Sequence, residues 1–135
     1  MTRVGDSKKL LAGPPASAIT RLAGLLALLI VPMIAITAVP VFVLGDAFGD
    51  SAVFGLALVA ILLLLAATGV VHTAAKIKEA REFYAGYTTV MRAHVGVDQI
   101  DPESGRVVRV AGEPFLTRDQ YDSRLALVRQ LGSEA

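Results

Sequence analysis

The sequence has no cysteine among its 135 residues. Disulfide bridges, thiolate metal sites and cysteine nucleophiles are therefore excluded. Charge is also missing from two long stretches: residues 22–44 carry no formal charge, and His72 is the only titratable group in residues 52–75. Hydrophobic residues make up 54% of the chain and are concentrated in these stretches, which is typical of a membrane protein and not of a soluble domain.

Each apolar stretch is long enough to cross a bilayer. As a helix, either one would extend about 35 Å, which exceeds a hydrocarbon core of roughly 30 Å. Only a helix satisfies the backbone groups of a single span in lipid. The connection, residues 45–51, is too short to hold structure of its own, so the sequence predicts an antiparallel transmembrane hairpin. Gly45 suits the end of the first helix, and Asp50 or Ser51 suits the start of the second.

Basic residues predict the orientation of this hairpin. Four precede the first span, four follow the second, and the loop between them has two aspartates and no base. The positive-inside rule then places both termini in the cytoplasm and the loop outside. The abundance of arginine and alanine, with no asparagine, favours a bacterial plasma membrane. The flanking bases are Arg3, Lys8, Lys9, Arg21, Lys76, Lys78, Arg81 and Arg92. Of these, the residues predicted to anchor to lipid headgroups are Arg21, Lys76, Lys78 and Arg81.

A cleavable signal peptide is an alternative interpretation of the first apolar stretch, with a site near Ala38. The apolar run continues beyond that point to Leu44, and about 20 residues precede it, which is long for the basic region of a signal peptide. The sequence favours a retained span.

Small residues near the cytoplasmic ends of the spans predict where helices pack closely. Pairs of small residues lie four positions apart, an arrangement that lets backbones approach: Thr20 with Gly24, Ala23 with Ala27, and Gly69 with Thr73. The predicted packing residues are Gly24, Ala27, Gly69 and Thr73. The partner is either the other helix of the hairpin or another protein. No Asp, Glu, Lys or Arg lies at mid-membrane, so a carrier or selective channel acting alone is not predicted.

Beyond the second span the sequence allows two continuations. Residues from Ile77 to His94 include a seam with alternating spacings of three and four, which would suit a short parallel coiled coil and a homo-oligomer. Alternatively, the helix ends at Ala85 with Gly86 as its cap, and Tyr84 and Tyr87 pack against the following tail. The helix propensities favour the second continuation.

The remaining tail predicts a β-hairpin followed by a helix. Two valine-rich stretches flank DPESG, so a hairpin is expected at about residues 95–110. Asp98, Asp101 and Glu103 are interpreted as exposed carboxylates of that turn and not as a cation site. An amphipathic helix at about residues 117–131, started by a capping box of Thr117 and Gln120, is expected to cover the ribbon.

These elements define the predicted fold class: an all-α integral membrane protein, a two-helix transmembrane hairpin with a small α+β cytoplasmic tail. From the N-terminus, the predicted segments are a cytoplasmic N-terminal segment (1–17), the first span (18–44), the external loop (45–51), the second span with its cytoplasmic continuation (52–85) and the tail (86–135). Apolar and aromatic residues of the cytoplasmic part are predicted to dock a partner or a second copy, namely Tyr84, Tyr87, Tyr121, Leu125 and Val128.

The sequence contains few motifs that indicate catalysis or ligand binding. There is no phosphate loop, nucleophile elbow or metal-ligand spacing, so no catalytic residue, cofactor site or metal site is predicted. Residues 95–135 carry five arginines against seven acids and have no nucleic-acid-binding stripe, and no small-molecule substrate is expected. The sequence therefore predicts a non-enzymatic accessory subunit or adaptor of a larger membrane complex, whose partners are the bilayer and other membrane subunits or itself.

A second interpretation comes from a resemblance of topology. Two spans, a short outer loop, cytoplasmic ends and a charged C-terminus resemble two-span phage holins. The resemblance implies a self-assembling protein that permeabilises the membrane. The tail of this chain is longer and less basic than is usual in that family, and the spans offer little polar surface to line a hole.

Overall fold

The computed structural model describes residues 8–134 and divides the chain into two compact units. One unit is the apolar hairpin, residues 20–74. The other, which we call the polar unit, combines described residues from both ends of the chain, 8–19 and 75–134. Arg3, one of the basic residues used to predict orientation, lies outside the described residues.

Helix α1 (Ala16–Leu44) begins two residues earlier than the sequence predicts. Pro15 precedes it, and its carbonyl accepts from the amides of Ala18 and Ile19 at 3.0 and 3.3 Å. A proline at a helix start costs nothing because the first amides have no partner in the helix anyway. Two further prolines lie inside α1 without ending it.

The connection between the long helices contains structure that the sequence did not predict. Residues Asp46–Gly49 form the single-turn helix α2, which follows Gly45 at a φ of 62°. The hydroxyl of Ser51 accepts from the amide of Phe54 at 3.2 Å, which confirms the predicted cap at the start of the next helix. The loop holds this turn because the same hydroxyl donates back to the carbonyl of Phe48 at 2.6 Å.

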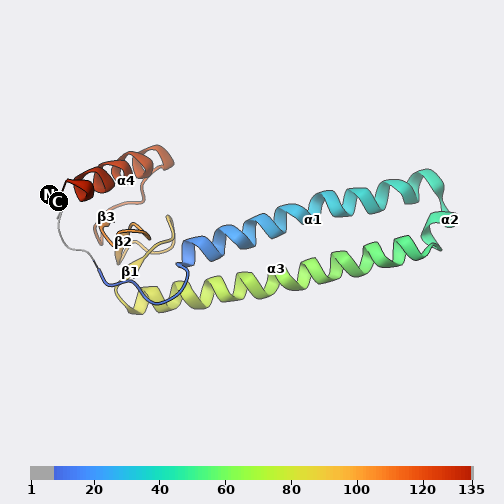
Figure 1. Ribbon diagram of the computed structural model, residues 1–135, viewed down its shortest axis with the longest axis horizontal. Helices are drawn as coiled ribbons and strands as arrows, with labels where there is room; N and C mark the ends of the chain where they lie inside the picture. Colours follow the sequence, from blue (N-terminus) through green and yellow to red (C-terminus); the bar gives the residue numbers. More distant parts are fainter. Residues whose placement is uncertain (1–7, 135) are drawn as a thin grey trace. The chain divides into compact units, whose positions relative to one another are not determined.

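Helix α3 (Ala52–Tyr84) is 33 residues long and runs antiparallel to α1 in Figure 1. Among the described residues, α1 and α3 are the two helices long and apolar enough to cross a membrane. Helix α3 ends at Tyr84, and Gly86 has a φ of 87°. The predicted end of the helix at Gly86 is therefore confirmed, because glycine adopts this left-handed conformation without a steric penalty. The packing predicted with it is confirmed for the buried Tyr87 and wrong for Tyr84, which is 87% exposed.

The tail forms a three-stranded sheet where the sequence predicted a two-stranded hairpin. Strands β2 (Asp98–Ile100) and β3 (Val107–Arg109) are antiparallel, as expected. Strand β1 (Tyr87–Thr88) was not predicted, and it pairs in parallel with β2, so the order is β1-β2-β3. The third strand supplies pairing that a lone ribbon lacks, since two strands are marginal by themselves.

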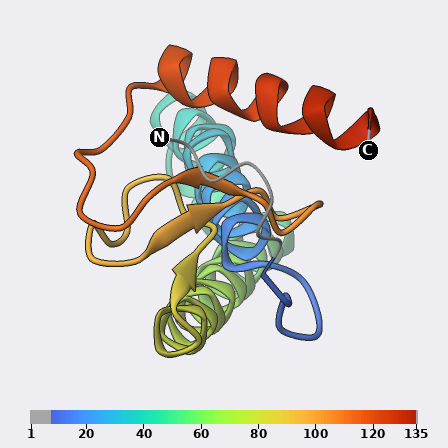
Figure 2. The same ribbon diagram turned by 90° about the vertical axis from the view of Figure 1, so that its left-hand side faces the viewer.

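Helix α4 (Arg118–Ser133) closes the polar unit and lies against β3 (Figure 2). Its predicted capping box is confirmed: the Thr117 hydroxyl accepts from the Gln120 amide, and the Gln120 side chain accepts from the Thr117 amide. The helix continues through Gly132 to Ser133, two residues beyond the predicted end at about residue 131. Val128 faces inward and is buried, as is Val108 of β3.

Candidate functional site

The start of α1 is capped by the side chains of two residues that lie more than 60 positions later in the chain, Glu82 of α3 and Thr89 after it. The first amides of a helix have no partner within it, and the prolines before α1 offer no capping side chain. Glu82 Oε1 accepts from the Ala16 amide at 2.8 Å, and Thr89 Oγ1 accepts from the Ser17 amide at 3.2 Å. A carboxylate suits this position because a helix N-terminus carries partial positive charge.

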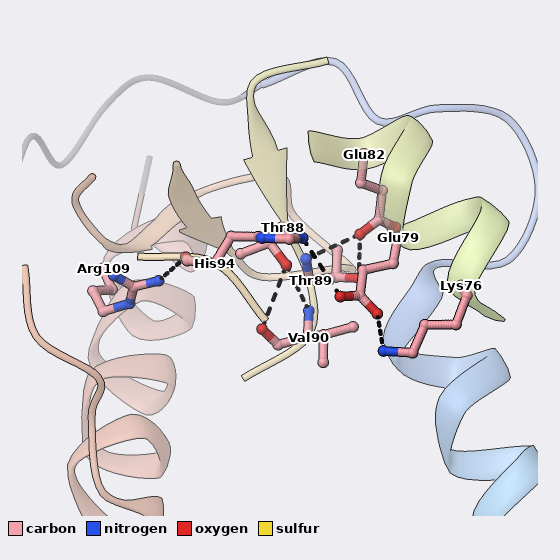
Figure 3. A network of polar contacts seen from close by, with 8 residues as sticks. All are labelled: Lys76, Glu79, Glu82, Thr88, Thr89, Val90, His94 and Arg109. Atoms are coloured by element: carbon pink, nitrogen blue, oxygen red, sulfur yellow. Dashed lines mark hydrogen bonds and ion pairs between the residues drawn. The ribbon is translucent and has the colours of Figure 1, made fainter. Parts of the chain in front are cut away.

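Glu82 also holds the segment that follows α3. Its Oε2 accepts from the Thr89 amide at 3.1 Å and from the Thr89 hydroxyl at 2.8 Å (Figure 3). The residue is 1% exposed, so three donors converge on a carboxylate that water does not reach. Glu82 thereby joins the start of α1, the end of α3 and the strand after it.

One turn earlier on α3, Glu79 forms a second, more open junction. Its Oε2 lies 3.1 Å from Lys76 Nζ and its Oε1 lies 3.4 Å from His94 Nε2. The His94 ring lies 4.6 Å from the ring of Phe83, between centroids. Glu79 and Glu82 are therefore on the inward side of α3, together with the buried Ala75.

The segment before α1, residues 8–15, lies against the sheet region, and we call it the N-terminal strap. The Lys8 amide donates to the Gly105 carbonyl at 2.8 Å. Its ammonium donates to the Gly86 carbonyl at 2.8 Å and pairs with Asp98 at 2.9 Å. Burial raises the pKa of Asp98, but hydrogen bonds from the Ala111 amide and from Lys8 outweigh it, so the pKa is lowered.

Tyr87 and Lys78 fasten the rest of the strap. The Tyr87 hydroxyl accepts from the Leu11 amide at 3.0 Å, and Lys78 Nζ donates to the Ala12 carbonyl at 2.7 Å. Burial raises the pKa of the Tyr87 hydroxyl, and the nearby Glu82 adds to this, against the opposing effect of the Leu11 amide. The strap is thus part of the polar unit, although the sequence indicated no structure for it.

A substitution at Gly105 would test whether the N-terminal strap is held against the turn between β2 and β3. A methyl group added there would lie 2.5 Å from the Lys8 carbonyl oxygen, whereas one added at Gly112 would meet nothing within 4 Å. Both glycines have positive φ, so alanine costs roughly 1–2 kcal/mol of strain at either position. We expect Gly105→Ala to destabilise the polar unit more than Gly112→Ala and to speed hydrogen exchange of the Lys8 and Leu11 amides. Equal exchange in the two variants would contradict the role assigned to the strap.

Asp101 joins α4 to the turn between β2 and β3. It is fully buried and accepts from the Glu103 and Ser104 amides, from the Ser104 hydroxyl at 2.6 Å and from Arg129 Nη2 at 2.8 Å. Burial alone would raise the pKa of Asp101, but the hydrogen bonds from Arg129 and Ser104 lower it. The interpretation of this group as exposed turn carboxylates is therefore wrong for Asp101 and holds for Glu103, whose side chain is 74% exposed.

Arg109 is a buried guanidinium that binds backbone carbonyls. Its Nη2 donates to the His94 carbonyl and its Nη1 to the Glu113 carbonyl, both at 2.7 Å. Its Nε donates to Gln99 Oε1 at 3.3 Å, and the guanidinium lies 5.4 Å from the Phe115 ring centroid. Burial lowers the pKa of Arg109. Arg109 therefore fixes the segment before β2 and the segment after β3. Within residues 8–134, the nearby Gln99 amide nitrogen has no hydrogen-bond partner.

One open hollow of about 400 Å³ lies between the β2–β3 turn and α4. Its charged lining residues are Asp101, Glu103, Arg106 and Arg129. Arg129 is paired with both acids, at 2.8 and 3.1 Å. The two acids and two bases balance, so the hollow has no net charge that would select an anion or a cation. Within residues 8–134, no group of three histidine or acidic side chains is placed to hold a metal ion.

The predicted docking residues have different environments. Tyr84 is 87% exposed, whereas Tyr87 and Val128 are buried within the polar unit. Tyr121 and Leu125 are partly exposed on α4. Tyr84 is therefore the member of this set most available to a partner in this conformation, and docking itself stays a prediction.

The residues predicted to anchor to lipid headgroups and to pack against other helices also differ in their exposure and contacts. Arg21 and Arg81 are exposed, whereas Lys76 and Lys78 make the contacts with Glu79 and Ala12 described above. All four predicted packing residues, Gly24, Ala27, Gly69 and Thr73, are exposed. A methyl group added at either glycine would meet nothing within 4 Å, so no neighbouring helix of the same chain fills these positions. Close helix packing there stays a prediction.

Helix α3 presents a continuous row of exposed residues opposite its buried residues Ala75, Glu79 and Glu82. The members of the row recur alternately four and three positions apart, and all are exposed. We call this row the outer face: Ala52, Leu56, Val59, Leu63, Ala66, Val70, Thr73, Ile77, Ala80 and Tyr84. In the last three turns of α3, glutamates therefore point inward and apolar side chains point outward, which reverses the usual pattern of a soluble helix.

Covering the exposed apolar side chains at the end of α3 would gain free energy. Ile77 is 51% exposed and Tyr84 is 87% exposed. Complete burial of one large apolar side chain is worth about 1.5–3 kcal/mol.

Sequence reasoning missed the residues that hold the polar unit together, namely Lys8, Glu82, Asp101 and Arg109. Only Asp101 had a local signal, because an aspartate followed by Pro, Glu and Ser can accept from the next amides as an Asx turn. Glu82 had none, since its partner Ala16 is 66 residues away. Compared with models of known families, with curated proteins and with solved structures, the chain gives no match.

Proposed function

We propose that this chain is a multi-pass protein of the bacterial plasma membrane, with both ends in the cytoplasm. It serves as a non-enzymatic accessory subunit or adaptor of a larger membrane complex. The hairpin anchors it and packs against membrane helices, and the polar unit docks a cytoplasmic partner.

The observation that carries this proposal is the composition of the polar unit. Residues 8–19 precede the first apolar helix, residues 75–134 follow the second, and they fold together. Contacts such as Ala16 with Glu82 support a topology with both ends of the hairpin on one side of a bilayer. Bases cluster at these ends, and the loop between them carries Asp46 and Asp50, so the positive-inside rule assigns that side to the cytoplasm.

The hydrogen bonds that the buried polar groups make support the proposed adaptor role. Glu82, Asp101 and Arg109 bind amides, carbonyls and other side chains of the chain itself, so these groups stabilise the fold of the polar unit. In the spans, the hydroxyls of Thr37 and Thr68 donate to carbonyls of their own helices. Their donors are therefore not free to line a hole, and the holin-like alternative gains no support.

Membrane topology can be tested with two matched alanine positions in this cysteine-free chain. Ala47 lies in the loop and Ala126 in the polar unit, and both are exposed. We expect a membrane-impermeant maleimide added to intact cells to label Ala47→Cys, and to label Ala126→Cys only after permeabilisation. Labelling of Ala126→Cys in intact cells would exclude a cytoplasmic polar unit. Resistance to alkaline extraction tests membrane insertion in the same samples.

The adaptor role is tested separately by purification of the full chain in mild detergent. Stoichiometric copurification of a membrane complex is expected. A stable chain that retains no other protein subunit would reject the accessory role while leaving the topology intact.

A further inference from the structure

The acidic residues near the end of α3 are turned into the polar unit (Figure 3). In the sequence, Glu79 and Glu82 stand among the bases that follow the apolar segment and would offset their charge. In the structure, Glu82 is 1% exposed and accepts from the amides of Ala16 and Thr89. Glu79 is buried as well and pairs with Lys76 and His94. Beyond Lys76, neither carboxylate therefore neutralises an exposed base of α3.

Three bases of the polar unit keep an unpaired charge close to the apolar hairpin. They are Lys9 of the N-terminal strap and Lys78 and Arg81 of α3. Within residues 8–134, no carboxylate forms an ion pair with any of them. Lys78 Nζ donates to the Ala12 carbonyl at 2.7 Å, and this contact leaves the charge in place because a carbonyl is neutral. Lys9 and Arg81 are exposed.

The exposed acids that lack a basic partner lie mainly on another element. Asp119 and Asp122 of α4 and Glu134 directly after it are exposed, and no base among the described residues pairs with them. On α4 a single base, Arg118, has no ion pair in this part of the chain. Charge is thus segregated within the polar unit, with unpaired bases on the two segments that join the apolar hairpin and an excess of unpaired acids on the helix that does not.

We propose that Lys9, Lys78 and Arg81 form a binding surface for the anionic phospholipid headgroups of the cytoplasmic leaflet. We call these three residues the basic surface. The inference rests on the membrane insertion proposed above, and it deepens that function by naming the class of lipid that the inserted chain selects.

The position of the basic surface along α3 suits this contact. Lys78 and Arg81 are three and six residues beyond Ala75, which is about 4.5 and 9 Å along a helix. Both are within about one Debye length of the end of the apolar segment, since that length is about 10 Å in 0.1 M salt. Side chains on a helix lean toward its N-terminus, which for α3 is the membrane side. Lys9 belongs to the same region because the strap is tied to Lys78 through Ala12.

An anionic leaflet suits these bases better than an acidic protein surface does. Ile77 and Tyr84 are neighbours of Arg81 on α3, four and three positions away, and both are exposed. An acidic protein surface offers the bases a partner but offers none to these two side chains. The headgroup layer accommodates basic, aromatic and apolar side chains together. It is also adjacent by construction, because α3 continues without a break from the apolar segment to these residues.

Lipid selectivity of the full chain can be measured by electron paramagnetic resonance. The chain is reconstituted in phosphatidylcholine bilayers that contain a trace of spin-labelled phosphatidylglycerol or spin-labelled phosphatidylcholine, and the immobilised fraction of each label is compared. A base beside an anionic surface contributes a preference of roughly fivefold at most. We expect a preference of about threefold or more for phosphatidylglycerol at low salt, which falls toward one in about 0.5 M salt because the Debye length shrinks. Equal immobilisation of the two labels at low salt would overturn the proposal.

Variants assign the selectivity to the basic surface. The double variant Lys9→Gln and Arg81→Gln removes two of its charges, and Lys78 is retained because it holds Ala12. We expect the preference for phosphatidylglycerol to fall at least twofold, whereas Arg81→Lys should keep it. Arg118→Gln is the matched control, since it removes an exposed base from α4. An unchanged preference in the double variant, or an equal fall in Arg118→Gln, contradicts the proposal.

Failure of this inference is distinguishable from failure of the proposed function. Insertion is verified in each sample by alkaline extraction, and protection of the Ala16 amide from hydrogen exchange verifies that the polar unit is folded. A chain that inserts and folds but shows no lipid preference rejects the basic surface alone. A chain that alkali extracts from the bilayer rejects the membrane insertion on which both rest. Selectivity that appears only when an acidic protein is added assigns the bases to that protein and overturns the proposal.

Discussion

Replacing Glu82 with glutamine is expected to lower the unfolding free energy of the polar unit by about 2–4 kcal/mol. The native carboxylate accepts three hydrogen bonds, from the Ala16 amide, the Thr89 amide and the Thr89 hydroxyl. Glutamine keeps the size of the side chain but turns one acceptor into an NH₂ group, which then faces a donor. At 1% exposure, water cannot relieve that conflict.

Hydrogen exchange of the full chain in lipid nanodiscs measures this effect. Protection of the Ala16 and Thr89 amides should fall roughly thirtyfold or more, since each 1.36 kcal/mol is a factor of ten. Glu79→Gln is the matched control one turn away: its partners Lys76 and His94 are 62% and 34% exposed, so water can replace the lost contacts and the cost is expected to be about 1 kcal/mol or less. If the two variants lost equal protection at Ala16, the capping role of Glu82 would be wrong.

Asp101→Asn is expected to cost about 2–3 kcal/mol and to release α4 from the sheet. The substitution leaves Arg129 without its buried carboxylate and sets an NH₂ group against the Ser104 donors. Removal of one member of a buried ion pair costs about 3–5 kcal/mol, and we reduce that figure because the Arg129 side chain is 42% exposed. Glu103→Gln is the control, since Glu103 contacts the same arginine from an exposed position and is expected to change stability by less than about 1 kcal/mol.

The same residue predicts a pH dependence. The pKa of Asp101 is lowered in the folded chain, as are those of Asp98 and Glu113. A carboxyl with a lowered pKa stabilises the fold above its unfolded pKa of about 3.9 and loses that contribution as the pH falls through the folded value. Stability of the polar unit should therefore be level above roughly pH 5 and decline below about pH 4. In Asp101→Asn the decline should be shallower; a profile that matches wild type in slope would remove Asp101 as its cause.

Features encoded within a few residues were predictable. The Thr117 and Gln120 cap, the Gly86 terminus and the Ser51 cap each depend on neighbours within one turn, so sequence indicates them directly. The two apolar helices follow from solvation alone. The hairpin of β2 and β3 follows from its turn residues.

Features that depend on distant residues were not predictable. Strand β1 has two residues and no alternating pattern, and only its pairing with β2 makes it a strand. Glu79 and Glu82 look like exposed charges that moderate the bases near the membrane, because nothing local shows that the start of α1 needs an acceptor. Lys8 looks like one more basic residue, although its amide and ammonium hold the strap to Gly105 and Asp98.

The cap on α1 also constrains the order of events during synthesis. Ala16 leaves the ribosome 66 residues before Glu82, and Thr89 follows later still. The first amides of α1 therefore have no native acceptor until the end of α3 and the segment after it have been made. The polar unit cannot close around the start of α1 while the chain is shorter than Thr89.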